Sequence, residues 1–95
     1  MNNWRVEYSD EARDDLRGLD GSAKLQVNKA IHKVSENPLS KSEGGYGTPL
    51  GHKRGLNLTG LLKIKLKRLG IRVIYSIERK EKEMLITVIA ARTDD

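Results

Sequence analysis

Residues 58–77 read LTGLLKIKLKRLGIRVIYSI, and the predicted fold is built around this stretch. Within it, residues 62–67 alternate apolar side chains with Lys63, Lys65 and Lys67. A period of two is typical of a β-strand that buries one face and leaves the other in water. The sequence therefore predicts a strand whose solvent-facing side is entirely cationic.

The second half of the stretch predicts a partner strand. After Arg68-Leu69-Gly70, residues 71–77 alternate again and are rich in β-branched and aromatic side chains, which favour strands. A short turn between the two strands places Arg72 on the same face as the lysines. We therefore expect an antiparallel hairpin with lysine and arginine together on one surface.

Positive charge is concentrated around this hairpin. No Asp or Glu occurs between Glu43 and Glu78, and the same segment contains seven basic residues, namely Lys53, Arg54, Lys63, Lys65, Lys67, Arg68 and Arg72. The other 11 Lys and Arg and 13 Asp and Glu give a charge of −2, so the segment accounts for the net charge of +5. Lysines on a strand face often serve only solubility. The absence of interleaved carboxylates favours a polyanionic partner such as RNA phosphate.

The N-terminal segment predicts a strand followed by a helix. Residues 4–8 alternate apolar and charged side chains, and Ser9 is a favourable N-cap. The helix is expected from about Asp10 to Arg17, and it ends at Gly18.

A second, longer helix is predicted over residues 23–36, with Ser22 as its N-cap. Its apolar face is expected to consist of Leu25, Ala30, Ile31 and Val34. Asn37-Pro38 ends it. The two helices would form an antiparallel hairpin across one face of a sheet.

The remaining residues predict loops and strands. Residues 39–51 are rich in glycine and are predicted to be loop, followed by a short strand over 52–57 and a turn or bulge at Thr59-Gly60. Residues 78–83 predict a charged turn, and residues 84–91 an interior strand with both faces largely covered. The predicted fold is one α+β domain over residues 1–95. It has an antiparallel sheet of about four strands, an N-terminal strand, and the two-helix hairpin packed on one face, which leaves the cationic face open.

Composition restricts the chemistry. The chain has no cysteine and two histidines, His32 and His52, without metal-ligand spacing, so we expect no metal site and no cofactor. It has no apolar run of membrane-spanning length and no export signal, which predicts a soluble, cytoplasmic protein. Lys, Arg and Tyr remain as catalytic groups. They suit RNA cleavage by the RNA's own 2′-hydroxyl, because fixed cations stabilise the extra negative charge of the transition state. A lysine near other cations has a lowered pKa, which favours proton transfer.

A family resemblance adds to this reading. Residues 49–78, PLGHKRGLNLTGLLKIKLKRLGIRVIYSIE, followed by an apolar strand ending in Ala91-Arg92, resemble the RelE branch of the RelE/ParE toxin superfamily. The resemblance implies the RelE-like microbial ribonuclease fold. It also implies a toxin of a type II toxin–antitoxin pair that cuts mRNA in the ribosomal A site without a metal. Its partners would be a cognate antitoxin, the ribosome and mRNA.

The resemblance also assigns site residues. It implies catalytic roles for Lys63, Lys65, Arg72 and Arg92: a lysine in proton transfer, Arg72 on the phosphate, and Arg92 stabilising the transition state. We expect Lys53, Arg54, Lys67 and Arg68 to contact RNA. Family members usually continue into a tail that bears Tyr or His, whereas this sequence stops at Asp95 without one, so we expect attenuated activity.

Two other functions remain open. A ParE-like gyrase poison shares the superfamily's fold but lacks this set of lysines and arginines. A non-catalytic RNA-binding module would use the same face for phosphate contacts alone, although few aromatic residues are available to stack on bases.

Overall fold

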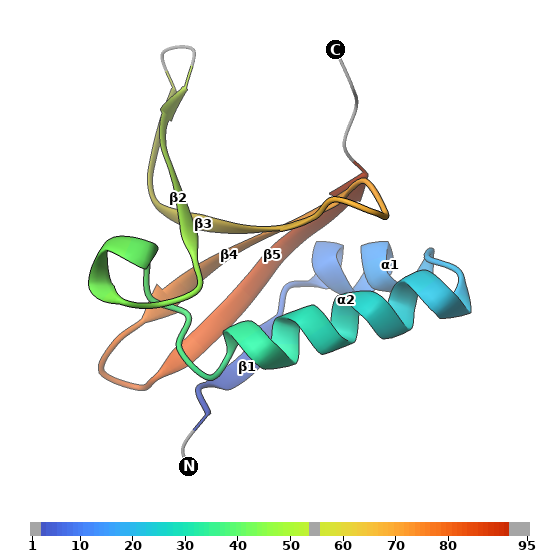
Figure 1. Cartoon of the computed structure of the whole chain (residues 1–95), viewed down its shortest axis with the longest axis horizontal. Helices are drawn as coiled ribbons and strands as arrows, with labels where there is room; N and C mark the ends of the chain where they lie inside the picture. Colours follow the sequence, from blue (N-terminus) through green and yellow to red (C-terminus); the bar gives the residue numbers. More distant parts are fainter. Residues whose placement is uncertain (1–2, 54–55, 92–95) are drawn as a thin grey trace.

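The hairpin predicted around residues 58–77 lies near one side of a larger sheet. The computed structural model describes residues 3–53 and 56–91, in which the sheet has the strand order β1-β5-β4-β3-β2 (Figure 1). The elements are β1 Arg5–Tyr8, α1 Asp10–Arg17, α2 Gly21–Val34, the 3-10 turn η1 Lys41–Glu43, β2 Thr48–Lys53, β3 Leu56–Leu66, β4 Ile71–Glu78 and β5 Glu83–Ala91. Both helices lie on the same side of the sheet. The α+β class predicted from the sequence is confirmed.

The pairing of β3 with β4 follows the predicted hairpin. The strands are antiparallel, and the register pairs Ile64 with Val73 and Lys65 with Arg72. Directly paired residues point to the same side of a sheet. Arg72 therefore lies on the lysine face, as predicted.

The sheet is mixed rather than wholly antiparallel. β1 pairs in parallel with β5, with Val6 opposite Met84 and Tyr8 opposite Ile86. Parallel neighbours cannot be joined by a tight hairpin, and here both helices and β2 to β4 separate β1 from β5 in the sequence. β5 lies in the interior between β1 and β4, as predicted. Its faces are not both covered, however, because Leu85 is 38% exposed.

The first helix matches the prediction and the second differs from it. Ser9 caps α1 through its hydroxyl, which accepts a hydrogen bond from the Ala12 amide at 3.0 Å. α2 is capped by Asp20 rather than Ser22, because the Asp20 carboxylate accepts from the Ala23 amide at 2.8 Å.

The buried face of α2 is also different from the predicted one. Its buried residues are Ala23, Val27, Ile31 and Val34. Leu25 lies two residues from both Ala23 and Val27, about 200° around the helix from each, and it is 57% exposed. The prediction that Leu25 belongs to the core was therefore wrong.

The glycine-rich segment contains more regular structure than expected. Residues 39–51 were predicted to be loop, yet they include η1 and the start of β2. β3 continues through Thr59-Gly60, so the segment is not a turn. The pairing with β2 shifts there, from Leu62 opposite Pro49 to Leu58 opposite Gly51, so the bulge that the sequence also allowed is confirmed. Gly60 has φ +91°, a backbone conformation that glycine adopts without steric cost.

The core lies between the helices and the sheet. A bulge between Ile74 and Tyr75 shifts the pairing with β5, and the Thr87 hydroxyl donates to the Ile74 carbonyl oxygen at 3.0 Å. This shift brings Ile89 to the buried side together with Met84 and Ile86. The buried apolar cluster consists of Ala12, Ala23, Val27, Ile31, Val34, Leu62, Ile71, Val73, Tyr75, Met84, Ile86 and Ile89.

Candidate nucleic-acid interface

The open face of the sheet brings Lys63, Lys65 and Arg72 together. Lys63 and Lys65 are two residues apart on β3, so their side chains point to the same side, about 7 Å apart at Cα. Arg72 on β4 lies directly opposite Lys65, and Ala90 on β5 lies on the other side of Arg72. Three cations therefore occupy neighbouring positions on one surface.

A hollow of about 410 Å³, here called the lysine hollow, lies over these lysines. Its lining comes from β3 with its following turn, from the loop before β2 and from the first residue of β2, and consists of Lys41, Tyr46, Thr48, Lys63, Ile64, Lys65 and Lys67. Lys65 is exposed, whereas Lys63 is only 8% exposed. The expectation that every lysine on this face is solvated was therefore wrong for Lys63. Thr48, which pairs with Lys63 across β2 and β3, and the loop that carries Tyr46 flank it.

The Arg72 side chain has a buried Nε–H donor without a hydrogen-bond acceptor among the described residues. The side chain as a whole is partly buried. Buried donors are normally satisfied, and an exception calls for a physical reason. A bound phosphate oxygen would satisfy this donor, because guanidinium groups hold phosphate through several hydrogen bonds.

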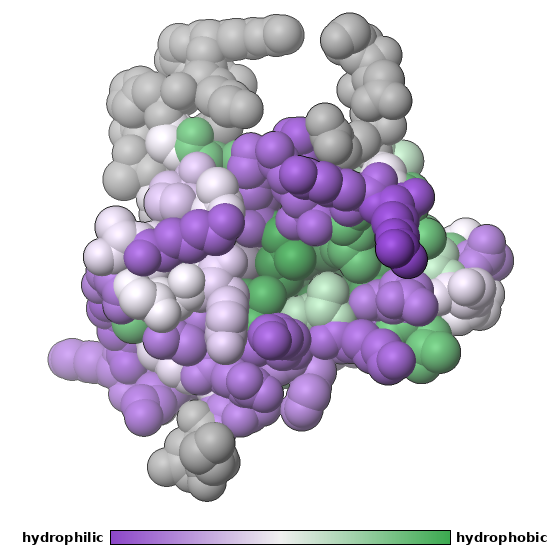
Figure 2. All heavy atoms as spheres, in the orientation of Figure 1, coloured by the Kyte–Doolittle hydropathy of each residue, from purple (hydrophilic) through white to green (hydrophobic). Residues whose placement is uncertain are grey.

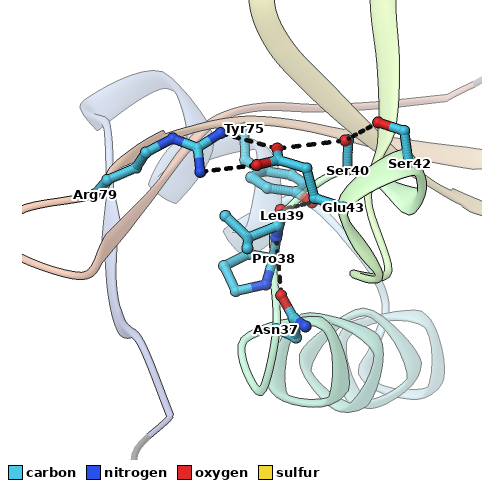
Figure 3. Close-up of polar contacts among 8 residues, drawn as sticks. All are labelled: Asn37, Pro38, Leu39, Ser40, Ser42, Glu43, Tyr75 and Arg79. Atoms are coloured by element: carbon cyan, nitrogen blue, oxygen red, sulfur yellow. Dashed lines mark hydrogen bonds and ion pairs between the residues drawn. The ribbon is translucent and has the colours of Figure 1, made fainter.

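The loop over residues 37–47 forms one wall of the hollow and is held by bonds to the sheet. Tyr75 at the centre of β4 donates its hydroxyl hydrogen to the Pro38 carbonyl oxygen at 2.8 Å (Figure 3). Arg79 forms two hydrogen bonds with Glu43, at 2.9 and 3.0 Å. These bonds from Arg79 lower the pKa of the Glu43 carboxyl. Burial raises the pKa of the Tyr75 hydroxyl well above its ordinary value. The loop is thus pinned at both a buried and an exposed point.

Two glycines fit this loop closely against its surroundings. A Cβ atom at Gly45 would lie 2.1 Å from the Leu39 carbonyl oxygen, and one at Gly47 would lie 2.2 Å from the Tyr75 hydroxyl. Neither distance is possible for a real side chain. The loop therefore depends on glycine at both positions, and Tyr46 lies between them at the edge of the hollow.

Comparisons with known proteins find matches by structure but not by sequence. No protein-family profile matches the chain, and no curated protein matches its sequence. Among solved structures, the isolated Escherichia coli RelE toxin superposes with a TM-score of 0.75 at 18% identity, over 97% of this chain and 87% of that one. The chain has the fold of RelE toxins.

Two solved toxin–antitoxin complexes are also similar to this chain in structure. The toxin–antitoxin complex RelBE2 from Mycobacterium tuberculosis gives a TM-score of 0.76 at 24% identity, over 99% of this chain and 97% of that one. The archaeal RelE–RelB complex from Pyrococcus horikoshii gives 0.69 at 18% identity, over 99% and 100%. The RelE-type fold expected from the sequence resemblance is therefore confirmed.

The other predicted site residues occupy different parts of this RelE-type fold. Lys67 lines the lysine hollow, and both Lys67 and Arg68 line another hollow of about 350 Å³ beside α2. The backbone of Lys53 pairs with Leu56 at the far end of β2, about 16 Å along the strand from Thr48. Arg54 and Arg92 lie outside the described residues.

The sequence interpretation missed three residues of the site. Lys41, Tyr46 and Thr48 belong to the segment predicted to be loop, and the tertiary structure brings them to β3. The sequence did contain a signal for Tyr46. It is an aromatic residue in a glycine-rich segment predicted to be loop, where an aromatic side chain is not expected to fill the core.

A second, more apolar hollow lies between α2 and β3 of the RelE-type fold. It has a volume of about 460 Å³ and is lined by Gln26, Lys29, Ala30, Lys33, Val34, Tyr46, Ile64 and Leu66. Figure 2 shows apolar residues at the centre of this side of the molecule, surrounded by hydrophilic ones. Such a surface is suited to an amphipathic protein segment.

The described residues contain neither a cluster of metal-ligating side chains nor a helix long and apolar enough to cross a bilayer. No group of three or more His, Cys, Asp or Glu that could hold a metal ion occurs in residues 3–53 and 56–91. A bilayer-spanning helix needs about 20 apolar residues, and no helix in the same ranges meets this requirement.

Proposed function

We propose that this single-domain chain is the toxin of a two-component toxin–antitoxin pair, acting in the cytoplasm as a ribosome-dependent, metal-independent endoribonuclease on mRNA. One observation carries the proposal: Lys65 lies directly opposite Arg72, and Lys63 lies two residues away on the same face. The likeness of the fold to the RelE toxins, two of them in complexes with antitoxins, supports the same function.

The cationic face suits cleavage by transesterification. The 2′-oxygen of the RNA loses its proton to a base and attacks the adjacent phosphorus. The bond from phosphorus to the 5′-oxygen breaks, and the leaving oxygen receives a proton from an acid. The products are a 2′,3′-cyclic phosphate and a 5′-hydroxyl, so no metal and no external co-reactant is required. Fixed cations lower the barrier because charge on the phosphoryl oxygens grows in the transition state.

The residues of the face would divide this work. Arg72 would hold the scissile phosphate, because its guanidinium remains charged and its buried Nε has no acceptor among the described residues. Lys63 and Lys65 would supply proton transfer and charge stabilisation from β3. Arg92 would add a further positive charge, as the family resemblance implies.

The proposed protein partner of this chain is an antitoxin. The apolar hollow between α2 and β3 could take an amphipathic segment, and Lys29 and Lys33 on its rim would favour acidic residues in that segment. RelB accompanies RelE in the similar complexes, which supports such a partner.

The nuclease proposal is tested in a translating extract. The purified chain is added, and new mRNA 5′ ends are mapped by primer extension, with Arg72→Ala and Lys80→Ala in parallel. Lys80 is an exposed cation in the turn between β4 and β5, so Lys80→Ala is a control for the loss of one charge. We expect cuts in register with the reading frame for the parent and Lys80→Ala. For Arg72→Ala we expect a loss of at least about 100-fold.

The outcomes separate the candidate functions. Removing a transition-state contact lowers the cutting rate far more than it lowers binding. If the parent binds RNA and never cuts it, the chain is an RNA-binding module. If it neither binds nor cuts, the gyrase-poisoning function of the other superfamily branch becomes the next to test.

A further inference from the structure

We infer that Tyr46 is a base-stacking residue, which holds a nucleobase of single-stranded RNA beside the lysine hollow while the lysines neutralise the neighbouring phosphates. The choice of RNA as the ligand rests on the proposed function. The residue itself is outside the set of lysines and arginines that the sequence assigned to that function.

Tyr46 differs from the other aromatic residues in its exposure. Tyr75 is fully buried at the centre of the sheet, and Trp4 and Tyr8 are partly buried against the apolar core. Tyr46 is 44% exposed. Because much of this side chain remains in contact with water, burial in the core does not fully account for a tyrosine at this position.

The surroundings of Tyr46 match a nucleotide. The ring borders the hollow of about 410 Å³ that also contains Lys41, Lys63, Lys65 and Lys67. Volumes of about 300 to 1,000 Å³ are usual for small-molecule sites. An aromatic ring next to a positively charged groove is the arrangement that holds single-stranded nucleic acid, with bases on the ring and phosphates on the cations.

One side of the ring is already occupied. The Lys33 ammonium lies 5.3 Å from the ring centroid, on the side of α2. Tyr46 lines both the apolar hollow beside α2 and the lysine hollow, so it stands between the two. The base would therefore stack from the side of the lysine hollow, and the cation on the opposite side would hold the ring in place.

The loop orients Tyr46 before any ligand binds. Its amide donates to the Asn37 carbonyl oxygen at 3.0 Å, and the Gly47 amide donates to the Leu39 carbonyl oxygen at 2.9 Å. A site that is already ordered loses less conformational entropy on binding. Stacking on such a ring tolerates any base, so Tyr46 would add affinity without sequence preference.

The inference is tested by binding, not cleavage. The probes are two fluorescein-labelled, 2′-O-methyl RNA pentamers, one with all its bases and one abasic throughout, because 2′-O-methyl RNA lacks the attacking hydroxyl. Dissociation constants are measured by fluorescence anisotropy at low salt for the parent, Tyr46→Phe and Tyr46→Leu. Tyr46→Phe keeps the ring, whereas Tyr46→Leu keeps an apolar side chain without it. Thermal melting checks that both variants are folded.

We expect Tyr46→Leu to weaken binding of the base-bearing pentamer about 5- to 100-fold, the usual range for one stacked base. Binding of the abasic pentamer should change less than about twofold, and Tyr46→Phe should match the parent with both probes. Equal losses with both pentamers, or none with either, would overturn the inference and assign Tyr46 to packing or to a protein contact. Absence of binding by the parent would overturn it as well.

The same measurements separate this inference from the nuclease proposal. Base-dependent binding that requires the ring, in a chain that never cuts mRNA, supports stacking and removes the nuclease proposal alone. Cutting that requires Arg72, together with binding that ignores the ring at position 46, removes stacking alone.

Discussion

Tyr75 donates its hydroxyl hydrogen to the carbonyl oxygen of Pro38 across 2.8 Å, and this bond ties the centre of the sheet to the loop that carries Tyr46. Both partners are buried, and they are 37 positions apart in the sequence. The wall of the candidate site therefore depends on a residue that itself lies within the core.

Replacing Tyr75 by Phe should remove this tie. The ring still fills the core, but the Pro38 carbonyl oxygen loses its partner, so we expect unfolding free energy to fall by about 1–3 kcal/mol. Urea denaturation measures the loss. Tyr46→Phe is the matched control, since it removes an exposed hydroxyl and should change stability by less than about 0.5 kcal/mol. Equal stabilities of Tyr75→Phe and the parent would contradict this role of the bond.

Alkaline pH should weaken the folded state through the same residue. Burial raises the pKa of Tyr75 above its ordinary value of 10.0, so the folded protein holds this proton more tightly than the unfolded chain does. The stabilisation is complete below about pH 10 and is lost as the pH rises further. Across pH 9 to 11.5, the parent should lose more stability than Tyr75→Phe, as followed by urea denaturation at each pH. Parallel curves for the two proteins would show that Tyr75 does not titrate differently on folding.

Adding one methyl group at Gly45 should disrupt the loop. The new Cβ of Gly45→Ala would lie 2.1 Å from the Leu39 carbonyl oxygen, a backbone atom that cannot rotate away. We expect a loss of about 2 kcal/mol or more in urea denaturation. Gly21→Ala, in the first turn of α2, meets nothing within 4 Å and should be neutral or stabilising by about 0.5 kcal/mol. The prediction fails if the two variants are equally stable.

The orientation of α2 can be tested with a pair of substitutions. Val27 is fully buried, so Val27→Ala removes two methyl groups from the core and should cost about 2–3 kcal/mol. Leu25 is 57% exposed, so Leu25→Ala should change stability by less than about 0.5 kcal/mol. Denaturant midpoints give both values. A larger loss for Leu25→Ala than for Val27→Ala would restore the helix face expected from the sequence.

Elements with local signals could be predicted from the sequence. Alternation over residues 62–67 and 71–77 predicted the β3 and β4 hairpin and the position of Arg72 beside the lysines, because a strand repeats every two residues whatever surrounds it. Ser9 predicted the start of α1 for a similar reason, since an N-cap bonds to an amide three residues away. For α2, Ser22 and Asp20 are both favourable caps, and local preference did not distinguish them.

Features that join distant segments are seen only in the tertiary structure. The parallel pairing of β1 with β5, the burial of Lys63, and the approach of Tyr46 to the lysine hollow each depend on contacts between separate parts of the chain. These contacts are stabilised by packing and by buried hydrogen bonds such as that from the Tyr75 hydroxyl to the Pro38 carbonyl oxygen. No periodic pattern records such contacts, because the residues that form them are neighbours in space and not in sequence.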